Sequence, residues 1–240
     1  IGNAALTSTT FILYLAVTKA PFKTENIHHF CKIFKIFTET KNIIFDLGGV
    51  LLNIDFEKSV TAFKKLGIEN FDEMFSQFKA DELFEKLETG NISEPDFYTA
   101  IKKRTAGNIS DTQIENAWNA LIMDFRPESL GFLEKLSANY KLYLLSNTNS
   151  IHLKCFKQLF TRETGKASLD SYFIKAWYSN EVGLRKPNAD IFEFVLHEEN
   201  LIAQETLFID DTLINIERAQ KMGFKTHHLL PTEKIEMIKL

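Results

Sequence analysis

Four polar elements of the sequence supply the residue types that chemistry on a phosphate ester would need: Asp46, Ser146 with Asn147, Lys186, and Asp210 with Asp211. A carboxylate can attack phosphorus and split the reaction through an aspartyl-phosphate. A hydroxyl and a backbone N–H can hold phosphoryl oxygens, and an ammonium group can neutralise their charge. A carboxylate pair suits Mg²⁺, which fills its remaining positions with water and substrate oxygens. Singly, each element could instead be a turn former, a helix cap or a solvated charge.

These elements need a scaffold that brings them together, and the sequence around Asp46 predicts one. The apolar run 43–45 ends at this carboxylate, and Gly48 and Gly49 follow, a pattern typical of a buried strand in a parallel sheet. In open α/β sheets, ligands bind beyond the carboxyl ends of the strands. Two later apolar runs also end at polar elements, so we expect these strand ends to meet at one edge of a sheet.

Strands and helices alternate from residue 127 to the end of the chain, which predicts a parallel sheet with crossover helices. The fold class is therefore α/β, with a Rossmann-like parallel sheet core and helices on both faces. We predict strands at 140–145, 172–178, 207–209 and 224–229, and helices at 128–138, 151–160, 187–199 and 213–222.

The block between these core segments shows only helical patterns. Apolar residues recur every three or four positions in stretches that include 56–66, 71–78 and 83–87, and no strand pattern interrupts them. Ser93 and Ser110 stand where helix N-caps are expected. We therefore predict an all-helical cap domain at 56–126, inserted into a core formed by 41–55 and 127–240.

Residues 1–40 fit poorly with the rest and form an N-terminal extension of unknown role. The chain has no initiating Met, so we interpret it as a fragment or a processed product. The apolar run 11–17 is too short to span a membrane, and no Lys or Arg precedes it, as a secretory signal would require. Apolar residues between 27 and 37 recur at helical spacing, and we expect this segment to pack loosely or to be disordered.

Composition limits the partners and the compartment. The formal net charge is −4 and no basic stripe stands out, which argues against nucleic-acid binding. Only two cysteines occur, Cys31 and Cys155, without metal-ligand spacing, so we expect free thiols and a cytoplasmic location. No apolar run reaches the roughly 20 residues that a membrane span needs. The oligomeric state is left open.

Together, the four elements resemble the motifs of the haloacid dehalogenase-like (HAD) hydrolase superfamily, in its phosphatase branch with a helical cap inserted after the first motif. The matching segments are FDLGGV at 45–50, LLSNT at 144–148, GLRKP at 183–187 and FIDDT at 208–212. They occur in the family's order and cover the chain from about residue 41. This order excludes a response-regulator receiver, which places its acidic pair first.

The resemblance implies a role for each element. Asp46 would be the nucleophile, Ser146 and the backbone N–H of Asn147 would hold the transferring phosphoryl group, and Lys186 would neutralise charge on both. The cap would close over the site, exclude water and select a small phosphorylated metabolite.

The resemblance also implies the cofactor Mg²⁺. Its ligands would be Asp46, the carbonyl of Gly48 and Asp211, with Asp210 adjacent and Asn215 as an outer partner.

One position departs from the family pattern. Phosphatases of this family usually carry a second Asp, the general acid and base, two residues after the nucleophile, where this chain has Gly48. General acid–base catalysis typically contributes about 10²–10⁴ in rate, so its loss would slow the enzyme without removing the other parts. Members with the same Asp-x-Gly pattern resemble sugar-phosphate phosphatases. Asp55 is the nearest alternative proton donor, unless it only caps a helix.

Three functions remain open at this stage. The leading hypothesis is Mg²⁺-dependent hydrolysis of a small phosphomonoester of the sugar-phosphate type, through an aspartyl-phosphate. A 2-haloacid dehalogenase would also lack the second Asp, but it would leave Asp210 and Asp211 without a task. A catalytically weak module that binds a phosphorylated ligand or a partner is the third alternative, and Gly48 is its best argument.

Overall fold

The computed structural model describes residues 39–76, 79–80, 82–105 and 108–239. The predictions made for residues 1–38, including the helical pattern between 27 and 37 and the state of Cys31, lie outside the described residues. Among the residues described, Cys155 is a free thiol. No helix within these ranges is both long and apolar enough to cross a membrane.

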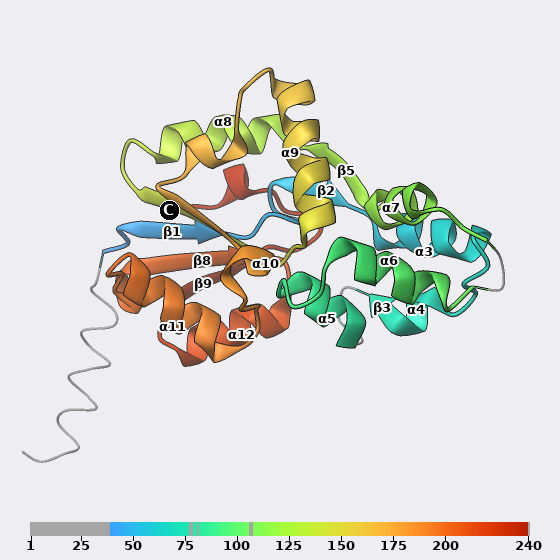
Figure 1. Cartoon of the computed structure of the whole chain (residues 1–240). Helices are drawn as coiled ribbons and strands as arrows, with labels where there is room; N and C mark the ends of the chain where they lie inside the picture. Colours follow the sequence, from blue (N-terminus) through green and yellow to red (C-terminus); the bar gives the residue numbers. More distant parts are fainter. Residues whose placement is uncertain (1–38, 77–78, 81, 106–107, 240) are drawn as a thin grey trace, which may run out of the picture. The chain divides into compact units, whose positions relative to one another are not determined.

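A five-stranded sheet with the order β7-β6-β1-β8-β9 forms the core (Figure 1). Every neighbouring pair is parallel, and β1 is central, with Phe45 in register with Leu144 of β6 and Ile209 of β8. The chain therefore changes direction across the sheet at β1, which is the kind of switch point where α/β proteins bind ligands. The strands are β1 (Asn42–Phe45), β6 (Lys141–Ser146), β7 (Lys175–Tyr178), β8 (Thr206–Asp210) and β9 (Lys225–His228).

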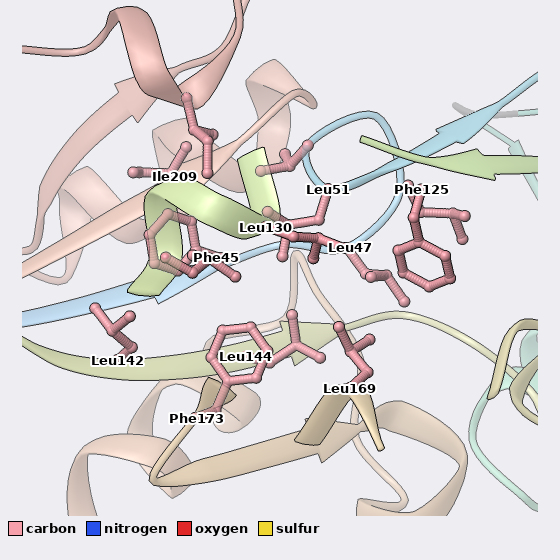
Figure 2. Close-up of a cluster of buried hydrophobic side chains, with 14 of the residues drawn as sticks. Phe45, Leu47, Leu51, Phe125, Leu130, Leu142, Leu144, Leu169, Phe173 and Ile209 are labelled. Carbon is pink, nitrogen blue, oxygen red and sulfur yellow. The ribbon is translucent and has the colours of Figure 1, made fainter. Parts of the chain in front are cut away.

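Helices cover both faces of the sheet because successive strand residues point to opposite sides. Ile43 and Phe45 belong to the hydrophobic cluster that includes residues of α8 and α9, whereas Ile44 packs with residues of α11 and α12. Figure 2 shows Phe45 among leucines from neighbouring elements in the first cluster. The helices are α8 (Pro127–Leu136), α9 (Ser150–Thr164), α11 (Ala189–Glu198) and α12 (Leu213–Lys221). The predicted α/β core is confirmed.

The inserted cap is held together by aromatic side chains. Trp118 is fully buried and contacts the rings of Phe63, Phe71, Phe84 and Phe97. Burial of several large rings in one cluster supplies most of the packing free energy available to so small a lobe. The cap helices are α3 (Phe56–Lys65), α4 (Phe71–Met74), α5 (Glu82–Glu88), α6 (Glu94–Lys102) and α7 (Asp111–Asn119).

The cap is not all-helical, which corrects the prediction. The helix expected at 71–78 ends at Met74, and β3 (Phe75–Ser76) then pairs with β4 (Lys79–Ala80). Aromatic residues fit strands at least as well as helices, so the apolar spacing alone misled. In addition, β5 (Ile122–Phe125) lies within the predicted cap and pairs antiparallel with β2 (Leu52–Ile54). This two-stranded ribbon connects core and cap, and the exact cap boundaries 56–126 stay a prediction.

The predicted N-caps are confirmed, because Ser93 and Ser110 accept backbone N–H groups of α6 and α7. The remaining elements are short. They are α10 (Ser179–Val182) and the 3₁₀ helices Leu169–Tyr172, Ala203–Glu205 and Ile235–Met237.

Candidate active site

A buried lysine joins two of the predicted strand-end carboxylates. Lys186 Nζ lies 2.7 Å from Asp46 Oδ1 and 2.7 Å from Asp210 Oδ2, and it is 1% exposed. Asp46 follows β1 directly and its backbone N–H donates to Ile209 of β8. Asp210 is the last residue of β8. Parallel register thus sets the two carboxylates side by side, and a lysine from 140 residues along the chain bridges them.

Asp210 is fully engaged in holding this arrangement. Its Oδ1 accepts from the backbone N–H of Thr212 at 2.8 Å, and both oxygens lie 3.1 Å from Nδ2 of Asn215. Together with the Lys186 contact, these donors occupy both carboxylate oxygens. The geometry therefore favours Asp210 as the residue that orients Lys186, and Asn215 as its support.

The acidic residues are spaced to share a cation. One oxygen each from Asp46, Asp210 and Asp211 lies within 4.8 Å of the others. Opposite ligands of an octahedral Mg²⁺ are about 4 Å apart, so a small adjustment would let the ion bridge them. Because Asp210 is already saturated with donors, Asp46 and Asp211 are the better ligands. Among the described residues, these three carboxylates are grouped near the Lys186 ammonium group, and a divalent cation would neutralise part of their negative charge.

The loop after Asp46 is shaped to admit Asp211. Gly49 has a φ of +70°, and a Cβ at this position would lie 2.1 Å from Asp211 Oδ2. Only glycine leaves room for the carboxylate to approach the backbone this closely. The carbonyl of Gly48, the remaining predicted ligand, belongs to the same loop, and its role as a metal ligand stays a prediction.

Burial and charge crowding shift the pKa values of these groups. Burial raises the pKa of Asp46 to about 7, and the nearby Asp210 and Asp211 carboxylates add to this against the opposing Lys186. Burial and Asp210 also raise the pKa of Asp211. For Lys186, burial lowers the pKa, but Asp210 and Asp46 outweigh it, so the pKa is raised and the group stays charged. A bound cation would favour ionised Asp46 in the same way.

The predicted phosphoryl cradle lies at the end of β6. Ser146 is the last strand residue and is buried. The side chain of Asn147 makes a reciprocal pair with the backbone of Lys186: its Nδ2 donates to the carbonyl at 2.8 Å, and its Oδ1 accepts from the N–H at 2.9 Å. The sequence predicted a role only for the backbone of Asn147. Its side chain locks the segment that carries the lysine.

Ser179 supports the cradle and Arg126 supports the loop after Asp46, and no sequence pattern indicated either role. Ser179 Oγ accepts from the backbone N–H of Thr148 at 2.9 Å and donates to its carbonyl at 2.8 Å, which ties the loop after β6 to α10. Arg126, the residue before α8, donates to Asn53 and to the carbonyl of Val50, so it braces the loop that follows Asp46.

The place where the family's second Asp would stand is lined by an apolar side chain. A Cβ on Gly48 would lie 3.0 Å from Cδ1 of Ile54, which is tighter than ordinary contact. Asp55, the alternative proton donor, accepts from the backbone N–H of Glu57 at 3.1 Å and thereby caps α3. The contact observed for Asp55 is therefore that of a helix cap, which was the alternative to a role as proton donor.

A family model described as haloacid dehalogenase-like hydrolase matches residues 40–223. The chain is 32% identical over 186 residues to a D-ribitol-5-phosphate phosphatase of Bacteroides thetaiotaomicron, covering 78% of this chain and 90% of that protein.

Solved structures of the same family also resemble this chain. A wild-type HAD family enzyme of Bacteroides thetaiotaomicron, in complex with magnesium and inorganic phosphate, superposes with a TM-score of 0.73 at 35% identity, covering 83% of this chain and 100% of that chain. A structure described as a predicted HAD-like family hydrolase of Porphyromonas gingivalis has a TM-score of 0.73 at 34% identity, covering 81% of this chain and 93% of that chain.

Proposed function

Because the chain belongs to the haloacid dehalogenase-like hydrolase family, we propose that it hydrolyses a small phosphomonoester of the sugar or polyol type, with Mg²⁺ and with Asp46 as nucleophile. The observation that supports this most is the cluster at the strand ends. Lys186 Nζ lies 2.7 Å from Asp46 Oδ1. One carboxylate oxygen of Asp211 lies within 4.8 Å of an oxygen of Asp46 and of an oxygen of Asp210. A nucleophile, a fixed cation and a metal-binding pair are the parts that phosphoryl transfer needs.

The reaction proceeds in two displacements on this geometry. Asp46 attacks phosphorus, the ester P–O bond breaks, and the alcohol leaves with the bonding electrons and takes up a proton. Water then attacks phosphorus of the aspartyl-phosphate, which releases phosphate and restores the carboxylate. Lys186 holds an oxygen of the nucleophile, and Ser146 with the N–H of Asn147 would receive the phosphoryl oxygens. When bound, Mg²⁺ neutralises phosphate charge, and Asp46, Asp211 and the Gly48 carbonyl would hold it.

The substrate class rests on two supports. The relative that shares 32% identity is named a D-ribitol-5-phosphate phosphatase, and it is aligned over 90% of its length. In addition, the Asp-x-Gly pattern that Gly48 creates resembles that of sugar-phosphate phosphatases. Without a carboxylic acid at this position, a sugar 1-phosphate would lose less rate than a primary alkyl phosphate. A cytoplasmic location stays a prediction from the low cysteine count.

The test is release of phosphate from p-nitrophenyl phosphate and from polyol and sugar phosphates, with and without Mg²⁺. We expect activity to disappear with a chelator, to return with Mg²⁺, and to fall at least about a thousandfold in Asp46→Asn, which removes the nucleophile. Glu217→Gln, which neutralises an exposed carboxylate on α12, serves as the matched control and should behave as the wild type.

Two other outcomes would replace the proposal. Metal-independent release of chloride from 2-chloropropionate would favour a haloacid dehalogenase. Thermal stabilisation by phosphorylated ligands, without turnover of any of them, would favour a binding module.

A further inference from the structure

The loop after α5 of the cap meets the core beside Lys186 at a very short backbone distance. Gly90 has a φ of +68°, and a Cβ on it would lie 2.3 Å from the backbone carbonyl oxygen of Asn180 in α10. Gly183, which ends α10, likewise faces the carbonyl of Thr89, 3.9 Å from the position of its would-be Cβ. At Gly90 the two backbones come this close only because glycine has no Cβ, whereas the distance at Gly183 is an ordinary contact. At this point the cap and the core are therefore in contact through the backbones of residues 89–90 and of α10 with Gly183.

Arg185, the residue before Lys186, crosses this junction and binds two glutamates of α5. Its Nη1 lies 2.9 Å from Glu85 Oε1 and its Nη2 lies 2.9 Å from Glu88 Oε2. The side chain of Glu88 is 11% exposed and that of Arg185 is 21% exposed, so this pair is largely withdrawn from water. Burial, with Glu85 nearby, raises the pKa of Glu88, and Arg185 opposes this shift. A buried carboxylate of this kind depends on its cation.

The contact between Arg185 and α5 lies one peptide bond away from Lys186. On the core side, Asn147 holds the backbone N–H and carbonyl of Lys186. On the cap side, the neighbouring Arg185 is held by Glu85 and Glu88. The junction is also incompletely satisfied: among the described residues, Glu88 Oε2, Arg185 Nε and Asn180 Oδ1 are buried without a hydrogen-bond partner. Arg185 and Glu88 therefore form an ion pair by distance but do not meet hydrogen-bond geometry. This charged junction, made by Glu85, Glu88, Gly90, Asn180 and Arg185, is called the ionic seam below.

We propose that Arg185 and Glu88 are positioning residues, which set the cap in register over the site by tying α5 to the segment that carries Lys186. This inference rests on the proposed function for its kinetic consequence. Neither residue needs to touch the phosphate. They act by favouring the arrangement in which α5 lies against the Lys186 segment, so loss of the pair makes the productive arrangement rarer.

The kinetic test is a double-mutant cycle with Arg185→Gln, Glu88→Gln and the double variant, each assayed with a polyol phosphate. Arg185→Gln leaves the Glu88 carboxylate buried without its cation, and we expect kcat/KM to fall about tenfold or more. Removal of both charges should restore part of that loss, so the double variant should be several-fold better than Arg185→Gln. Additive losses in the cycle, or an unchanged Arg185→Gln, would overturn the proposal.

A second pair across the cap and core supplies the matched control. Lys154 of α9 and Glu94 of α6 face each other at 3.9 Å, with side chains 60% and 28% exposed. The same cycle with Lys154→Gln and Glu94→Gln removes one charge of each sign between the same two lobes. Exposed pairs contribute little, so kcat/KM should change less than about threefold. A loss equal to that of the Arg185 cycle would show a general effect of charge removal.

Amide hydrogen exchange tests the proposal without turnover. The N–H groups of Thr89, Gly90 and Asn91 donate to carbonyls of α5, so their exchange reports on the end of this helix. We expect Arg185→Gln to speed their exchange and Lys154→Gln to leave it unchanged. If the wild type releases no phosphate, the proposed function fails while exchange still decides the inference. Unchanged exchange in Arg185→Gln would refute it, provided thermal unfolding confirms that the variant is folded.

Discussion

Among the described residues, two of the contacts between cap and core are built on opposite principles. In the ionic seam, Arg185, the residue before Lys186, pairs with Glu85 and Glu88 of α5. The second, which we call the neutral seam, joins Trp118 and Asn119 of α7 to Asn149 and His152 at the start of α9. The rings of Trp118 and His152 stack at 4.6 Å with an angle of 19°, and His152 Nδ1 lies 2.9 Å from Asn119 Oδ1.

The neutral seam carries no formal charge because burial lowers the pKa of His152 to about 3. Its Trp118 Nε1 donates to Asn149, and Ile151 of α9 packs into the aromatic cluster of the cap. Stacking and close packing depend little on salt or substrate. In a buried ion pair, loss of one partner leaves the other charge buried without compensation, which is strongly destabilising. We infer that the neutral seam maintains the attachment of the cap and that the ionic seam adjusts its register. Damage to the first should appear in stability, and damage to the second in turnover.

The largest expected effect comes from removing the centre of the neutral seam. Trp118→Ala would empty a fully buried site shared by four phenylalanine rings and His152. Large-to-small changes of this kind cost about 3–5 kcal/mol of unfolding free energy. Urea unfolding would measure it, with Trp118→Phe as the milder control. If Trp118→Ala cost less than Arg185→Gln in unfolding free energy, the division between the seams would be wrong.

A smaller effect concerns pH. The pKa of His152 falls from 6.5 to about 3 on folding, so below pH 6.5 the unfolded chain binds the extra proton. Stability from this group is complete above pH 6.5 and is lost as pH falls toward 3, by up to a few kcal/mol. In His152→Gln this component should be absent, so the difference in unfolding free energy between variant and wild type should shrink across that window. Parallel curves for the two proteins would refute the assignment.

The smallest expected effect lies on the ribbon that connects core and cap, away from both seams. Gly48→Asp restores the family's carboxylic acid, but its Cβ would lie 3.0 Å from Ile54 Cδ1. Ile54→Val removes that atom. We expect Gly48→Asp with Ile54→Val to hydrolyse an alkyl phosphate up to about tenfold faster than Gly48→Asp alone, with little change on p-nitrophenyl phosphate, whose leaving group needs no proton. An equal gain from Ile54→Val alone would contradict this explanation.

Much of the core was predictable because its information is local. An apolar run followed by a polar residue indicates a buried strand with a functional end, and this rule located Asp46, Ser146 and Asp210. The parallel register then brings those ends together, whatever the loops do. Lys186 follows no strand, so its position at the site could be expected only from the motif.

The features that the sequence did not reveal are contacts between distant segments. Arg185 meets Glu85 from 100 residues away, and nothing near either residue indicates the pairing. The same holds for Ser179 and for the strand β5, whose partner β2 lies before the cap. In the cap, spacing of apolar residues gave the helices but not the end of α4, because aromatic residues serve both helix and strand.

The central place of β1 in the sheet has a consequence for how the protein is made. One of its neighbours, β8, begins 164 residues further along the chain, where Thr206 bonds Asn42. Contacts of such long range form slowly. During synthesis, one edge of β1 stays uncovered until the chain has been made beyond residue 206, and until then Lys186 has no Asp210 to contact. An uncovered strand edge on a growing chain favours aggregation, so the yield of the protein in a cell depends on what shields that edge.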